Sequence, residues 1–288
     1  MSPLSFAVVG SADALDAGAV SVLFNRSTSG DAAVRADTAD ILARVRTEGD
    51  DALRSLARQF DGATLNDLEV PRARWDQALA SLEPALRRAL ERSTANVREV
   101  HESFRPRPQE LVTADGVVIG RRPDALQRVG VYAPGGRAAY PSSLLMGVVP
   151  ARVAGVGEII VCSPPDASGS PSSVVLAAAA MAGADRVFAV GGAGAIAAMA
   201  FGTQSVPAVD RIVGPGNAWV AEAKLQVSNR VGIDAPAGPS ELLILADGSA
   251  TPEVLAREML AQAEHDPVAA VVLVSDSDAL IRAVAQEI

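Results

Sequence analysis

The chain has 288 residues, 49% of them hydrophobic and 3% aromatic, which is enough for one large or two medium domains with cores of Ala, Val, Leu and Ile. A formal net charge of −9 and a pI near 4.8 argue against nucleic acid or an anionic membrane as a partner. No apolar run approaches the roughly 18 residues of a membrane span, and the N-terminus lacks the basic-then-apolar pattern of a secretory signal.

Cys162 is the only cysteine, which excludes an internal disulfide and is typical of a protein from the reducing cytosol. A cytoplasmic location is therefore expected. Because Cys162 ends the apolar run 159–162, we interpret it as a small core residue and not as a nucleophile.

The first third of the chain predicts two long amphipathic helices. One covers residues 37–60, bends near Gly49 and stops at Asp61-Gly62; its apolar stripe is Leu42, Val45, Leu53, Leu56 and Phe60. The second covers 74–104, with Trp75, Leu79, Leu82, Leu86 and Leu90 at helical spacing. Both carry charges on the opposite face, so we interpret them as solvated helices packed on a core.

From Arg128 onward, short β-branched runs alternate with Ala-rich runs, a pattern typical of βαβ units and a parallel sheet. The predicted strands are 129–132, 158–162, 186–190, 211–213, 242–245 and 270–274. The predicted helices are 142–155, 171–182, 193–201, 217–229 and 252–265. The pattern therefore predicts an α/β fold.

Three glycine-containing turns follow predicted strands, where α/β folds gather their ligands. Tyr132-Ala-Pro-Gly-Gly136 lets backbone amides approach a ligand, although it is equally typical of a plain turn. Gly192-Ala-Gly194-Ala-Ile-Ala197 matches the loose dinucleotide pattern G-x-G-x-x-A, and Asp210 loosely offers the acidic residue that should follow. An Ala-rich helix start mimics that pattern easily. In Gly214-Pro-Gly-Asn217, Asn217 suits both a helix N-cap and an anion site.

A second set of candidates lies further along the chain. Ser240, in the turn Pro236-Ala-Gly-Pro-Ser-Glu241, projects from the start of a strand. Gln262 and His265 lie about 60° apart around the predicted helix, so both side chains can reach one point. Two ligands make an incomplete zinc site, because catalytic zinc usually takes three protein ligands. A structural histidine is the alternative.

Taken together, these segments resemble histidinol dehydrogenase in their order and spacing. The matching segments are Arg128–Gly136, Val190–Gly192, Ala200–Gly202, Gly214–Asn217, Glu222–Lys224, Pro236–Glu241 and Gln262–His265, with Glu48–Leu53 and Phe60–Gly62 upstream. The resemblance covers nearly the whole chain from about residue 37, and the set of segments is far more specific than any one of them.

The resemblance implies a cytoplasmic, homodimeric enzyme that uses NAD and zinc to oxidise L-histidinol through the aldehyde to L-histidine. It assigns Tyr132 and Asn217 to the cofactor, Ser240 to the substrate, and Gln262 and His265 to both zinc and substrate. It implies two incomplete Rossmann-like domains with parallel sheets and N-terminal helices. One domain, on the metal and substrate side, would comprise residues 1–125 and 241–288, and the inserted NAD-binding domain would comprise 126–240.

The chain departs from the family pattern in two ways. Gly194 replaces a glutamine that contacts the cofactor. The family's catalytic Glu-His pair, its C-terminal domains and its remaining Asp and His zinc ligands lie beyond Ile288, so we expect a truncated or fragmentary, catalytically incomplete chain with no catalytic residue of its own. The other histidine, His101, matches a helix position that we interpret as structural. Two alternatives stay open, a related zinc-dependent dehydrogenase of another small polyol and a non-catalytic remnant.

Overall fold

The computed structural model describes residues 10–24, 32–135, 139–235, 241–264 and 269–288. Contacts divide the chain into two compact units, one of residues 31–236 and the other of residues 1–30 with 237–288. The predicted α/β fold is confirmed. The contacts group residues 31–125 with the large sheet, whereas the sequence prediction grouped them with 241–288. The assignment of NAD and metal to separate domains stays a prediction.

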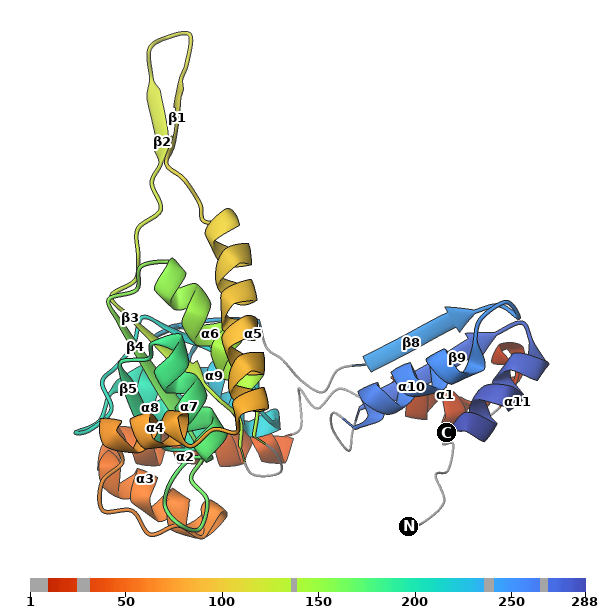
Figure 1. The fold of residues 1–288 in the computed structure, drawn as a ribbon, viewed down its shortest axis with the longest axis horizontal. Coiled ribbons are helices and arrows are strands. Elements are labelled where there is room, and N and C mark those ends of the chain that lie inside the picture. The colour runs from red at the N-terminus through yellow and green to blue at the C-terminus, as the bar shows by residue number, and fades with distance from the viewer. Residues whose placement is uncertain (1–9, 25–31, 136–138, 236–240, 265–268) are drawn as a thin grey trace. The chain divides into compact units, whose positions relative to one another are not determined.

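The larger unit is built on a five-stranded parallel sheet (Figure 1). Its strands, in spatial order, are β5 (Arg186–Ala189), β4 (Glu158–Ser163), β3 (Arg128–Tyr132), β6 (Arg211–Val213) and β7 (Gly232–Ile233). The chain moves outward from β3 through β4 to β5 and then crosses back to β6 and β7. The strand order therefore reverses between β3 and β6, as it does between the two halves of a Rossmann fold.

Helices on the two faces of this sheet follow from that reversal. Because βαβ crossovers are right-handed, the helices of the outward path and those of the return path cover opposite faces. The outward helices are α6 (Pro141–Val153) and α7 (Ser173–Ala182), and the return helices are α8 (Gly192–Phe201) and α9 (Ala218–Val227). Each pair packs together. The core between them includes Cys162, which is buried as predicted, and burial raises the pKa of its thiol to about 12.

The N-terminal helices form an outer layer on the larger unit. The predicted bend at Gly49 is a complete break between α2 (Ala32–Glu48) and α3 (Asp50–Leu56), with Gly49 at a φ of 60°. The remaining elements are the π-helical turn η2 (Ala57–Asp61), α4 (Arg72–Ala80) and α5 (Pro84–Ser103). Helix α2 packs on α8 and α9, α4 on α7, and α5 on α6. Phe60, predicted in the apolar stripe, is instead 65% exposed, because the π-helical turn changes the helical spacing.

An antiparallel hairpin that the sequence pattern did not predict projects from this unit (Figure 1). Strands β1 (Gln109–Val112) and β2 (Val118–Arg121) are exposed along their whole length. Five of its aliphatic residues are exposed, namely Leu111, Val112, Val117, Val118 and Ile119. The hairpin therefore adds no core to the unit.

The smaller unit contains a two-stranded parallel sheet of β8 (Glu241–Ala246) and β9 (Ala270–Ser275). Its helices are α1 (Ala17–Phe24), α10 (Pro252–Ala263) and α11 (Asp278–Glu287), preceded by the 3-10 turn η1 (Ala12–Ala14). Helices α10 and α11 enclose a small core of Ala256, Met259, Leu280 and Val284. No helix in the described part of either unit is long and apolar enough to cross a membrane.

Candidate functional site

The candidate site of the larger unit lies at the carboxyl ends of β3 and β6, where the strand order reverses. Open α/β sheets bind ligands at this position. Tyr132 is the last residue of β3, and Gly214–Asn217 follows β6 directly. Two segments that the sequence analysis singled out are therefore neighbours, since β3 and β6 are paired up to Val131 and Val213.

Pro164, directly after β4, separates two of the glycine turns. A Cβ on Gly135 would lie 2.8 Å from the Pro164 ring, and one on Gly191 would lie 2.6 Å from it. Neither position has room for a side chain. Gly192, by contrast, has a φ of 59° and no atom within 4 Å of a built Cβ, so there is open space beside this one glycine at the start of α8.

Tyr132 joins two of these turns through its phenol. The Tyr132 hydroxyl accepts a hydrogen bond of 3.1 Å from the backbone N–H of Gly192, at the start of α8. Burial raises the pKa of Tyr132 to about 12, opposed by the Gly192 bond and reinforced by the charge on Asp61. The phenol is therefore neutral near pH 7. Tyr132 is only 4% exposed, and the hydrogen bond of its phenol is made to α8 and not to solvent.

Asp61 is a member of this site that the sequence analysis treated only as a helix stop. Asp61 precedes the η2 C-cap Gly62, is partly buried, and interacts electrostatically with Tyr132, which lies far away in the sequence. Burial raises the pKa of its carboxyl to about 6. No sequence pattern marks such a pairing, because it depends on where η2 packs against the sheet.

Asn217 is the N-cap of α9, as the sequence predicted. Its Oδ1 accepts a hydrogen bond of 3.1 Å from the backbone N–H of Val220, and the residue is exposed. The first amides of a helix are unpaired and carry partial positive charge, so this end of α9 suits a phosphate group. The cap and a ligand role are compatible.

The dinucleotide pattern at Gly192–Ala197 follows a different strand of the sheet from the one that the usual fingerprint follows. It follows β5, two strands away from β3, whereas the fingerprint normally follows the first strand of the fold. Asp210 is wrong as its acidic partner. It precedes β6 and accepts a 2.8 Å hydrogen bond from the N–H of Arg128, so it lies at the amino ends of the strands, opposite the site.

Gly194 faces inward from α8. A Cβ at this position would lie 3.0 Å from Leu56 Cδ1 and 3.4 Å from Leu53 Cδ2, both on α3. The glycine therefore lets α3 pack closely against α8. Any longer side chain at residue 194 has to bend past α3 before it reaches the site.

A family model described as histidinol dehydrogenase matches residues 24–288. The chain belongs to the histidinol dehydrogenase family. It is 51% identical over 239 residues to the histidinol dehydrogenase of Methanothermobacter thermautotrophicus, covering 83% of this chain and 56% of that one. With the enzyme of Bordetella parapertussis it shares 46% identity over 284 residues, covering 96% of this chain and 64% of the relative. The chain thus spans about three fifths of the length of these relatives.

A solved histidinol dehydrogenase structure agrees with this assignment. The crystal structure of the Elizabethkingia anophelis enzyme matches with a TM-score of 0.83 and 34% sequence identity, covering 88% of this chain and 59% of that chain. The shared fold confirms the predicted family resemblance.

Of the residues that the histidinol dehydrogenase resemblance assigns to zinc and substrate, Gln262 is among the described residues and lies in the smaller unit. Gln262 is in the last turn of α10 and is half-buried. Ser240 and His265 lie outside the described residues. Among the described residues, no group of three or more His, Cys, Asp and Glu side chains is placed to hold a metal ion. The convergence of Gln262 and His265 stays a prediction.

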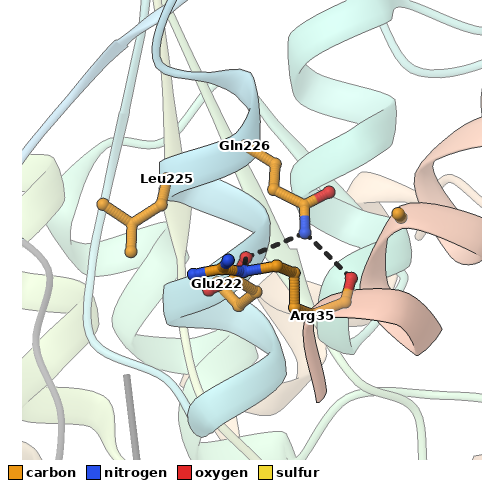
Figure 2. Close-up of a pocket in the computed structure, with 5 residues that line it drawn as sticks. Arg35, Glu222, Leu225 and Gln226 are labelled. Carbon is orange, nitrogen blue, oxygen red and sulfur yellow. Dashed lines mark hydrogen bonds and ion pairs between the residues drawn. The ribbon is translucent and has the colours of Figure 1, made fainter. Parts of the chain in front are cut away.

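A surface groove of about 480 Å³ lies elsewhere in the larger unit, between α2 and α9 (Figure 2). Its residues are Arg35, Ala39, Glu222, Leu225 and Gln226. Gln226 Nε2 donates to Glu222 Oε1 at 2.8 Å and to the Arg35 carbonyl at 3.0 Å, and Arg35 Nε lies 3.7 Å from the same carboxylate. These polar groups bond to one another, so the groove serves to join the two helices.

Proposed function

We propose that this chain takes part in the NAD-dependent oxidation of L-histidinol, through L-histidinaldehyde, to L-histidine. The observation that supports the proposal is that Tyr132 ends β3 and the Gly214–Asn217 turn follows the paired strand β6, at the reversal of the strand order in a chain of the histidinol dehydrogenase family. A small-molecule substrate, a homodimer and a cytoplasmic location go with this proposal.

The chain's own residues supply three features suited to a dinucleotide. The start of α9 presents the positive end of the helix dipole to a pyrophosphate, with the Val220 N–H already held by Asn217. Glycines with no side chain let a ligand approach the turns closely. The neutral Tyr132 phenol holds the start of α8 without placing a negative charge beside the phosphates. Bound NAD would accept the hydride taken from the alcohol.

The proposal includes zinc only because the resemblance to histidinol dehydrogenase implies it. Gln262 would supply one oxygen, whereas a catalytic zinc usually takes three protein ligands. The described residues do not make up that set. They therefore do not fit the metal, and no reaction step is assigned to it. The roles of Gln262 and His265 with metal and substrate, and of Ser240 with substrate, are predictions for mutagenesis.

A growth experiment tests the function in the source organism. Disruption of the gene is expected to cause histidine auxotrophy, because the last oxidation steps are lost. Growth should return with L-histidine in the medium and not with L-histidinol, while an intact copy of the gene restores growth on either. Growth of the disrupted strain on L-histidinol alone, or without any supplement, would contradict the proposal and favour another small polyol as substrate.

A further inference from the structure

We propose that Lys224 and Asp234 form a clamp that holds the Gly214–Asn217 turn in the shape that receives NAD. Both would be positioning residues, since neither is assigned a contact with the cofactor. The inference rests on the proposed function for its ligand, but the clamp itself is defined by contacts within the larger unit.

Three hydrogen bonds close the clamp on Gly214. Lys224 Nζ donates to Asp234 Oδ1 and to the Gly214 carbonyl oxygen, each at 2.5 Å. The Gly214 N–H donates to Asp234 Oδ2 at 2.7 Å. One side-chain pair therefore binds both backbone polar groups of a single glycine, and both oxygens of the carboxylate are used.

The position of Lys224 on α9 suits this role. It lies seven residues after Asn217, which is about two helical turns, so the two residues are on nearly the same side of the helix. Glu222, two residues earlier, lies on another side and bonds to Gln226 toward α2. Within the Glu222-Ala-Lys224 segment, one charge thus joins α9 to α2 and the other joins it to the turn.

The turn needs such a restraint because its backbone is unusual and tightly confined. Gly214 has a φ of 116°, which L side chains rarely adopt, and a Cβ there would lie 2.1 Å from the carbonyl oxygen of Tyr132. A Cβ on Gly216 would lie 2.3 Å from Val220 Cγ1. The turn lies between the end of β3 and the start of α9. Because Asn217 follows Gly214 by three residues, a small rotation of the Gly214 backbone would shift Asn217.

An ion pair with one buried member is weak evidence for a stabilising role, and here Lys224 is buried while the Asp234 side chain is 34% exposed. Lys224 is 1% exposed, and desolvating its ammonium costs free energy that the partner only partly returns. Apolar residues of similar volume often replace such pairs with no loss of stability. Fixing the geometry of Gly214 gives the pair a role that an apolar replacement could not supply.

The double variant Lys224→Met/Asp234→Leu tests the clamp, because it removes both charges together and leaves no unpaired buried ion. We expect a cooperative thermal transition close to that of the wild type. The dissociation constant for NAD, measured by titration calorimetry, should rise at least tenfold. The Gly214 amide should exchange with deuterium at least tenfold faster.

Arg152→Met is the matched control. It breaks the ion pair with Asp185, whose carboxylate binds the N–H of Ile159 at the amino end of β4, so NAD affinity should not change. Unchanged NAD affinity and unchanged Gly214 exchange in the double variant would overturn the clamp. If the wild type fails to bind NAD, the proposed function is contradicted, and the exchange of the Gly214 amide decides the clamp alone.

Discussion

At the candidate site, burial shifts the pKa values of individual side chains more than pairing with an opposite charge does. Burial is the largest cause of the raised pKa of both Tyr132 and Asp61. A carboxyl with a pKa near 6 changes charge in the range where enzymes work, and groups of this kind gather at functional sites. Asp61 therefore joins Tyr132 and Asn217 as a residue for mutagenesis.

Asp61 gives a pH-dependent prediction. Its pKa is raised from 3.8 to about 6 in the folded chain, so the folded state binds the proton more tightly. The stability from this proton is complete below about pH 4 and is lost as the pH rises through about 6. Asp61→Asn should therefore increase the free energy of unfolding more at pH 7.5 than at pH 4.5, measured by urea titration. The exposed Asp115→Asn is the control, and an equal effect of Asp61→Asn at both pH values would contradict the prediction.

Among the elements, α9 combines a structural cap with a candidate anion site, and substitutions at Asn217 separate the two. Asp and Ser both cap helices well, whereas Ala costs about 1 kcal/mol. Asn217→Asp should keep the thermal stability but weaken NAD binding about tenfold, because it adds a negative charge where the pyrophosphate would bind. Asn217→Ser should keep both properties. Calorimetric NAD titration with thermal unfolding checks this, and tight NAD binding by Asn217→Asp would exclude the phosphate role.

The elements also show how far sequence patterns reach. Strands β3 to β6 were predictable because strands of a parallel sheet are buried on both faces and appear as continuous apolar runs. The hairpin of β1 and β2 was missed because its aliphatic residues are exposed and because the Asp115-Gly116 pair in its turn, which favours a hairpin, was not weighed. The loop at 113–117 is five residues long, whereas such a pair most often marks a two-residue loop. Two-residue β7 is too short for any pattern.

The candidate site was predictable only in part, for a related reason. Asn217 follows a local rule for helix caps, and Tyr132 lies in a recognisable strand and turn. Asp61 and the bonds from Lys224 and Asp234 to Gly214 join elements whose contact is decided by packing. Asp210 was wrong because the sequence spacing gave no information about which end of the sheet it would occupy.

At the scale of the whole molecule, apolar surface is distributed unevenly. In the smaller unit, Ile244 and Leu273 pack toward the helices, while Leu243 and Leu245 are 68% and 81% exposed on the other face of β8. Parallel sheets are normally covered on both faces. An open aliphatic face of this kind marks an interaction site or an aggregation hazard.

This surface predicts that the chain in solution binds a hydrophobic fluorescent dye. Leu243→Thr/Leu245→Thr should lower the dye fluorescence at least twofold and leave the circular dichroism spectrum unchanged. Leu273→Thr, on the covered face, is the matched control and should lower the unfolding temperature instead. Dye fluorescence that is weak in the wild type, or the same in the double variant, would show that the face is covered in solution.

The contact of Pro164 with Gly135 and Gly191 bears on how this family can vary. Surface loops usually accept insertions and new side chains independently of one another. Here the connections after three adjacent strands touch through one proline ring, with no room for a methyl group at either glycine. A change in one of these loops must therefore be accommodated by the other two. The sequences of the three loops are expected to change together among relatives.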